Sequence, residues 1–227
     1  MRKLRFSTEL AYLVGIVLLA FSTAMMEKAD FGLSMVVAPA YLVYLKLSQT
    51  LPFFTFGMAE YLLQGLLLVA MMLLLRRFRM SYLFSFVTAV FYGLLLDGSM
   101  ALIADAPTGV GARLAFFFCG FVLCATGVAF VFRTYIAPEA YELFVKTIAA
   151  AKGKNVNRVK MVYDCVSCAV GIVLSFCFFG FGHLEGVKLG TVFCALMNGT
   201  TIGLIGKGLD RVFTFVDVLP LRKYFED

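Results

Sequence analysis

Six polar side chains interrupt long apolar stretches of the sequence, and they are the residues most suited to chemistry. They are Glu60, Gln64, Asp97, Asp164, Asn198 and Thr201. A carboxylate in the middle of a membrane span costs at least roughly 2.5–3.5 kcal/mol, so it persists mostly where it lines a cavity or meets a partner. We therefore expect these six residues to bind a small-molecule substrate between membrane helices.

The spacing of the first three residues leaves two readings open. Glu60 and Gln64 are four residues apart, which puts both on one face of a helix and predicts a polar stripe toward the interior. Alternatively, Glu60 meets water near the outer interface. Asp97 precedes Gly98 and Ser99, where a helix can loosen and expose backbone carbonyls. Its alternative role is to cap the last helical turn.

The last three residues carry similar alternatives. Asp164 follows Arg158 and Lys160, so it is either a substrate ligand or a simple ion-pair partner near a helix start. Asn198 and Thr201 flank a glycine in the last apolar stretch, and we expect a binding element there near the middle of the membrane. The other reading is that small residues at this point only let two helices approach closely.

The residues needed for catalysis or metal binding are missing from the sequence. Its one histidine is His183, too few for a Ser/His/Asp arrangement or a His-rich metal site, and no phosphate-binding loop or nucleotide fingerprint appears. The six cysteines lie in apolar stretches, where a thiol behaves as a small buried hydrophobe. We expect no enzyme, no cofactor and no metal.

Composition indicates that the lipid bilayer is the solvent of this chain. Of 227 residues, 62% are apolar and only 15% are charged, and the mean hydropathy is +0.92. A soluble domain carries roughly 25% charged residues. Nucleic-acid binding is a poor reading of such a chain.

Six stretches are long and apolar enough to cross a membrane, which requires about 20 residues each. They cover residues 8–26, 53–75, 81–104, 112–132, 160–181 and 189–212. The fold class is therefore an all-α membrane protein. Residues 32–48, broken by a proline, predict a re-entrant or interfacial helix, and residues 137–152 predict an amphipathic helix on the membrane surface.

The distribution of Lys and Arg predicts the orientation, because positively charged loops remain on the cytoplasmic side. With the N-terminus inside, sixteen of the twenty basic residues fall on the inner side. The four on the outer side are Lys28, Lys46, Arg113 and Lys188. We expect a multi-pass protein of the cell inner (cytoplasmic) membrane with both termini in the cytoplasm.

The two halves of the chain resemble each other weakly. An Ala-Pro segment ending in Tyr41 follows the first apolar stretch, and a similar segment ending in Tyr141 follows the fourth. Three spans per half is an odd number, so the halves would insert with opposite orientations. The expected organisation is one transmembrane domain over 1–227, with repeats at 1–108 and 109–215 and a tail at 216–227.

The second half also resembles a family of bacterial membrane proteins known as YczE/YyaS/YitT. The likeness rests on Arg158, Asp164 and Gly171, on the Gly-Thr of residues 190–191 that opens the last span, and on residues 195–199, Ala-Leu-Met-Asn-Gly. Residues 183–185, His-Leu-Glu, depart from the glycine-rich turn of that family. The resemblance implies a membrane protein usually supposed to be a transporter, without an assured substrate.

We therefore expect a small-molecule transporter or facilitator with its substrate site at the midplane between inverted repeats. Its expected partners are a small-molecule substrate and the lipid bilayer, with a homo-oligomer or an energising subunit as a further possibility. Two alternatives remain open. One is a membrane scaffold or assembly protein that docks a cytoplasmic partner. The other is the substrate-binding subunit of a larger transport complex.

Overall fold

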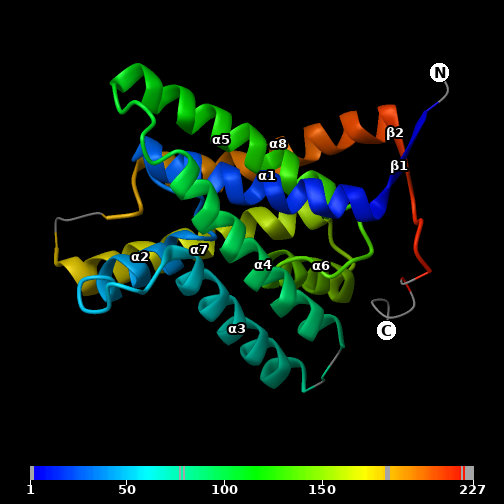
Figure 1. The fold of residues 1–227 in the computed structure, drawn as a ribbon. Coiled ribbons are helices and arrows are strands. Elements are labelled where there is room, and N and C mark those ends of the chain that lie inside the picture. The colour runs from blue at the N-terminus through cyan, green and yellow to red at the C-terminus, as the bar shows by residue number, and fades with distance from the viewer. Residues whose placement is uncertain (1–2, 77, 79, 182–184, 221, 223–227) are drawn as a thin grey trace.

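The computed structural model describes residues 3–76, 78, 80–181, 185–220 and 222, and it is a bundle of helices (Figure 1). Six of its helices are long and apolar enough to cross a membrane. They are α1 (Thr8–Ala29), α3 (Phe56–Leu75), α4 (Met80–Leu102), α5 (Val110–Val131), α7 (Val156–Phe179) and α8 (Leu189–Val212). The six predicted spans are confirmed, with bounds that differ by a few residues.

Side-chain caps fix where several of these helices begin. Ser7 accepts a hydrogen bond from the backbone N–H of Leu10, and Thr55 accepts one from Met58. Asn155 does the same for Asn157 at the start of α7. Each cap satisfies one of the backbone donors that have no partner within the first turn of a helix.

Two shorter helices, α2 (Ala38–Leu47) and α6 (Ala140–Lys152), lie between the long ones. The first residues of both are buried, including Ala38 and Ala40 in α2 and Ala140 and Tyr141 in α6. The expectation of a helix near residues 137–152 is confirmed. Its first turn is buried rather than exposed, and the helix packs against α3, α4 and α7.

The helices make a recurring set of contacts around a central pair, α1 and α5. In the first half of the chain α3 packs on α4, and α4 packs on α1. In the second half α7 packs on α8, and α8 packs on α5. The short helices cross over, since α2 contacts α7 and α6 contacts α3. Gly15 and Gly127 meet where α1 crosses α5, and a methyl group on Gly15 would lie 3.0 Å from the Gly127 carbonyl oxygen.

The two chain ends lie at one end of the bundle (Figure 1). Strand β1 (Leu4–Ser7) pairs in parallel with β2 (Phe213–Val216), an element that the sequence pattern does not predict. Thr8 donates a hydrogen bond of 2.8 Å to Asp217, and the backbone N–H of Leu219 donates one of 2.8 Å to Glu9. These contacts fasten the C-terminal segment to the start of α1.

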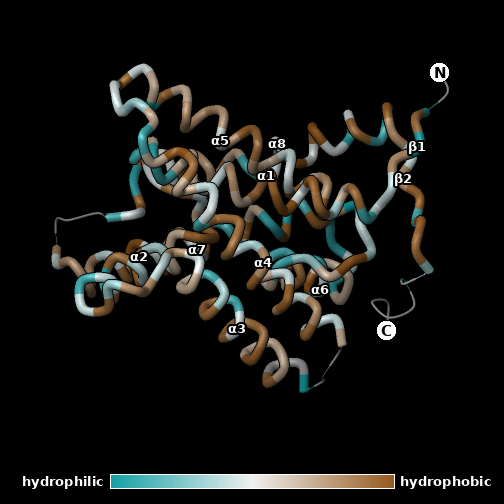
Figure 2. The backbone as a smooth tube through the Cα atoms, in the orientation of Figure 1, coloured by the Kyte–Doolittle hydropathy of each residue, from teal (hydrophilic) through white to brown (hydrophobic). Residues whose placement is uncertain are grey.

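Hydrophobic residues cover most of the outer surface of α3 and α4 (Figure 2). At the bundle end opposite the strands, Asp30 forms ion pairs with Arg113, at 2.7 Å, and with Lys188. Lys28 of the same end donates to the carbonyl of Ala104. Three of the four basic residues predicted on the outer side, Lys28, Arg113 and Lys188, therefore lie together at this end of the bundle.

Candidate functional site

A buried cluster of polar side chains lies where the first turn of α6 enters the bundle. We call it the central cluster. Every member is at most 5% exposed, and the members come from α3, from α6 and the residue before it, from α7 and from α8. They are Glu60, Gln64, Glu139, Tyr141, Glu142, Lys160, Asp164 and Asn198.

Gln64 joins α3 to the start of α6. Its amide nitrogen donates to Glu139, at 3.0 Å, and to Glu60, at 3.3 Å. Its amide oxygen accepts from the backbone N–H of Ala140, at 3.0 Å. Tyr141 donates to Glu60 over 3.3 Å. One amide side chain thus holds two carboxyl groups together and satisfies a backbone donor of α6.

Lys160 joins α7 to the same turn of α6. Its ammonium group lies 3.2 Å from Glu142 and 3.0 Å from Asp164, and Lys160 and Asp164 are one helical turn apart. Asn198 of α8 lines the same cavity as Lys160 and Glu142. A buried ion pair offsets its desolvation only when its geometry is good, so this arrangement depends on all three helices being in place.

The peptide that leads into α6 is fixed by α4. Ser85 donates a 2.6 Å hydrogen bond to the carbonyl of Pro138, and Thr88 donates one of 3.0 Å to the carbonyl of Ala137. The hydroxyl of Tyr12 lies 2.6 Å from that of Thr88. Because these carbonyls belong to non-helical backbone, they need such donors inside the bundle.

The N-termini of both short helices border one small cavity of about 20 Å³. Ser34, Val36 and Val37 line it from the segment before α2, and Glu139, Tyr141 and Glu142 line it from the start of α6. The N-terminus of a helix carries a partial positive charge. The two short helices therefore direct their positive ends toward a space that also contains carboxyl groups.

Burial and neighbouring charges act together on Glu139. Burial raises the pKa of the Glu139 carboxyl well above its ordinary value, and the nearby Glu142 and Glu60 raise it further. The hydrogen bond from Gln64 and the ammonium group of Lys160 act in the opposite direction. Two or more carboxyl groups so close together do not all ionise easily, which makes the cluster a place to hold a proton or a cation.

Comparison with known proteins gives a family for this chain. Residues 6–207 match the family described as "Family of unknown function (DUF6198)". The chain belongs to DUF6198. No curated protein and no solved structure matches it.

The structure of this DUF6198 chain brings four of the six predicted site residues together. Glu60, Gln64, Asp164 and Asn198 are all members of the central cluster. Glu60 is fully buried, so it does not face water, and Asp164 does pair with Lys160. Each of the four could take part in binding, and the pairing of Asp164 does not exclude that role.

The other two predicted site residues lie elsewhere. Asp97 accepts a 2.9 Å hydrogen bond from the backbone N–H of Gly57 and so caps the start of α3 from α4. Thr201 donates a 3.0 Å hydrogen bond to Met197 of its own helix. A methyl group on Gly199 would lie 2.8 Å from the Asn157 carbonyl oxygen, which agrees with the reading that this glycine lets α7 and α8 approach closely. His183 lies outside the described residues.

Sequence reasoning missed three charged members of the DUF6198 cluster. Glu139 and Glu142 lie in a segment whose amphipathic pattern favoured the membrane surface, and Lys160 was counted among the loop charges that set orientation. One sequence signal could have identified Lys160. Glu60 and Gln64 are the fifth and ninth residues of α3, and Lys160 and Asp164 are the fifth and ninth residues of α7.

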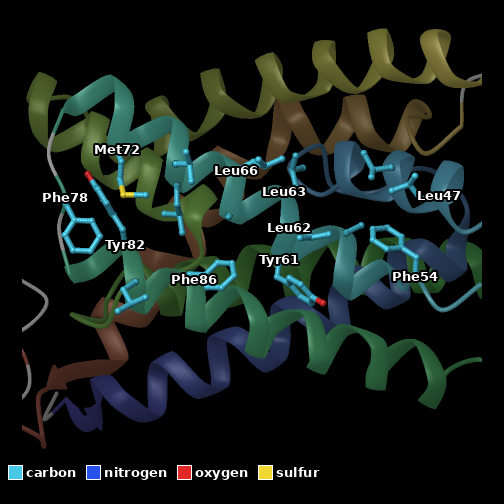
Figure 3. A pocket seen from close by; sticks show the side chains of 16 residues that line it. Leu47, Phe54, Tyr61, Leu62, Leu63, Leu66, Met72, Phe78, Tyr82 and Phe86 are labelled. Carbon is cyan, nitrogen blue, oxygen red and sulfur yellow. The ribbon is translucent and has the colours of Figure 1, made fainter. Parts of the chain in front are cut away.

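A separate feature is an apolar groove of about 610 Å³ along α3 and α4 (Figure 3). Leu62, Leu66, Phe78 and Phe86 line it and are more than a third exposed. Among the described residues, no charged side chain lines this groove. In a chain that crosses a membrane, such a face suits acyl chains, and it is separate from the central cluster.

Proposed function

We propose that this protein is a small-molecule membrane transporter or facilitator whose substrate passes through the central cluster. One observation carries the proposal. Two short helices enter the bundle, and their N-termini border the same small cavity, which the buried carboxyl groups of Glu139 and Glu142 also line. Buried charges inside a membrane are costly and mark substrate or ion pathways. Broken helices that meet at such a site are the usual plan of secondary transporters.

The helix contacts support the inverted-repeat part of this proposal. Exchanging α1 with α5, α2 with α6, α3 with α7 and α4 with α8 turns each of the main contacts in the first half into one in the second. The polar pairs of α3 and α7 occupy the same positions in their helices, and both touch the residues that begin α6. In this proposal the two halves rock against each other around the cluster, as in alternating access.

The small size of the cavity suits an occluded conformation in this mechanism. About 20 Å³ holds one water-sized species, so a larger solute requires the halves to separate. The Gln64 and Lys160 contacts join the start of α6 to opposite halves of the proposed repeat. Opening the site would break either the Gln64 contacts or the Lys160 contacts, while the other contacts remained.

The location and the family resemblance belong to the same proposal. The excess of Lys and Arg at the end that carries the chain termini favours a cytoplasmic position for that end. Two of the residues on which the YczE/YyaS/YitT resemblance rests, Asp164 and Asn198, are members of the central cluster. We therefore propose an inner-membrane protein with kinship to that family.

The test begins with the purified protein in detergent. A thermal-shift screen against amino acids, vitamins, nucleobases and simple ions identifies a compound that stabilises the folded state by mass action. Uptake of that compound, radiolabelled, is then measured in proteoliposomes. We expect Asp164→Asn to lower the uptake rate by at least about tenfold, since a buried charge contact is lost. Asp97→Asn is the matched control, because this carboxylate lies outside the cluster.

The scaffold alternative predicts the opposite pattern. Charge reversals at the exposed residues Lys152, Lys154 and Arg158 would then abolish function in cells, while Asp164→Asn would leave it intact. Absence of uptake for every compound that stabilises the protein, together with that pattern, overturns the transport proposal. Co-purification with an ATPase, with uptake only in its presence, would instead identify the chain as a subunit of a larger complex.

A further inference from the structure

Two buried oxygen atoms border the central cavity without a hydrogen-bond donor among the described residues. They are Oε1 of Glu139 and Oδ1 of Asn198. The two side chains are 3% and 2% exposed, and both line the same cavity. Leaving a buried acceptor unsatisfied costs about 1–3 kcal/mol, and more when the group is charged. Because both atoms are acceptors, the species that satisfies them must be a donor or a cation.

The size of the cavity narrows the choice of species. Its volume of about 20 Å³ is slightly above the roughly 10–15 Å³ that one water molecule needs, so it suits a species about the size of water. An unhydrated Na⁺ is smaller than a water molecule. Thr23, Ser34 and Tyr92 bring further hydroxyl oxygens to the wall. Neutral and anionic oxygens are the ligands that hard cations prefer.

The charge balance of the cluster favours a cation over a neutral occupant. Glu60, Glu139, Glu142 and Asp164 are four acids, and Lys160 is the one basic member of the central cluster. Lys160 and about half a positive charge from each of the two short-helix N-termini together offset two of the four acids, so the other two carboxyl groups must each keep a proton or meet a cation. Lys160, which also lines the cavity, pairs with Glu142 and Asp164, and no ion pair joins it to Glu139 among the described residues.

The arrangement of the possible ligands argues against a divalent or transition metal. Among the described residues, no group of three or more His, Cys, Asp or Glu side chains is arranged to hold a metal ion. A monovalent ion needs less negative charge from its ligands. One carboxylate together with amide and hydroxyl oxygens meets that need.

We propose that the cavity between the N-termini of α2 and α6 binds one Na⁺ ion, with Glu139 and Asn198 as ligands. The role of the ion rests on the proposed transport function, in which Na⁺ would be the coupling ion. The binding site itself does not depend on that function. Glu139 reaches the cavity from the residue before α6, in one half of the chain, and Gln64, in the other half, holds it there. An ion at this point would therefore bind most tightly when the halves are closed.

The experiment is equilibrium binding of ²²Na⁺ to the purified full-length protein in detergent, at constant ionic strength maintained with choline chloride. We expect saturable binding of one ion per chain, competition by Li⁺ and weaker competition by K⁺. Glu139→Gln and Asn198→Leu should each lower the affinity by about tenfold or more. Asp97→Asn and Thr201→Val, which change polar residues outside the cluster, should leave it unchanged.

Each other outcome has a definite meaning. No saturable ²²Na⁺ binding to well-folded protein overturns the inference, as does equal binding in the wild type and both cluster variants. If Glu139→Gln does not fold, Asn198→Leu carries the test, because its side chain makes no ion pair. Saturable ²²Na⁺ binding without any uptake in proteoliposomes would support the ion site and overturn the transport function. Uptake that depends on pH but not on Na⁺ would support transport and overturn Na⁺ as the coupling ion in favour of a proton.

Discussion

Gln64 of α3 donates a 3.0 Å hydrogen bond to Glu139, which lies 75 residues later in the chain. The same amide group donates to Glu60 and accepts from the backbone N–H of Ala140. A single neutral side chain therefore sets the distance between two carboxyl groups and anchors the start of a short helix. The position of α6, and with it the shape of the cavity, depends on this residue.

Replacing Gln64 with leucine should destabilise the protein strongly. The variant keeps a similar volume but leaves Glu60, Glu139 and a backbone donor without their partner, so we expect the free energy of unfolding to fall by about 2–4 kcal/mol. Denaturant or thermal unfolding in detergent micelles measures the loss. Thr201→Val is the matched control, since its hydroxyl bonds only within α8. Equal stability of the two variants would show that the Gln64 contacts are not needed.

Lys160 should be more important to stability than either acid beside it. Lys160→Met leaves Glu142 and Asp164 buried without a cation, and we expect a loss of about 3–5 kcal/mol. The double variant Lys160→Met with Asp164→Asn should recover part of this loss, with an interaction energy of at least about 1 kcal/mol in a double-mutant cycle. Additive effects would mean that the two residues act independently.

Gly57 and Gly98 should respond in opposite ways to alanine. A methyl group on Gly57 would overlap the Gly93 carbonyl and the Asp97 carboxylate, whereas one on Gly98 would meet nothing within 4 Å. We expect Gly57→Ala to cost about 1–3 kcal/mol through overpacking. Gly98→Ala should instead stabilise by about 0.4–1 kcal/mol by restricting the unfolded chain. Melting temperatures of the two variants give the comparison, and a shift of the same sign in both would contradict it.

Lys146 should make stability rise with pH in the alkaline range. Burial lowers the pKa of this lysine from 10.5 to about 8 in the folded protein, against the opposing effect of Glu142. Folding thus disfavours the charged form, and this cost is present in full below pH 8 and disappears as pH approaches 10.5. Lys146→Met lacks the titrating group, so the stability difference between wild type and variant should shift in favour of the wild type across that range. A difference that is constant with pH would show that Lys146 titrates normally.

The fold was largely predictable from the sequence because the six spans are long and apolar. The bilayer sets the length of such a segment, so α1 and α8 are visible in hydropathy alone. The placement of α6 was not visible. Its charged face resembles a surface helix, and only the partners supplied by Gln64 and Lys160 allow Glu139 and Glu142 to be buried.

The candidate site was predictable only in part for the same physical reason. A polar residue in an apolar span stands out, which identified Glu60, Gln64, Asp164 and Asn198. Sequence position does not reveal whether such a residue faces a cavity or a neighbouring backbone. Asp97 looked equally suitable, yet it serves as a cap for α3. The pairing of β1 with β2 was also hidden, because a partner more than 200 residues away leaves no local pattern.

That strand pairing has a consequence for synthesis. Leu4–Ser7 leaves the ribosome 209 residues ahead of its partner Phe213–Val216. At ribosomal rates of about 5–20 residues per second, β1 waits roughly ten seconds or longer for its partner. Translation thus imposes an order in which β1 is made long before its native partner, and a nascent chain that stalls before residue 213 would leave β1 unpaired.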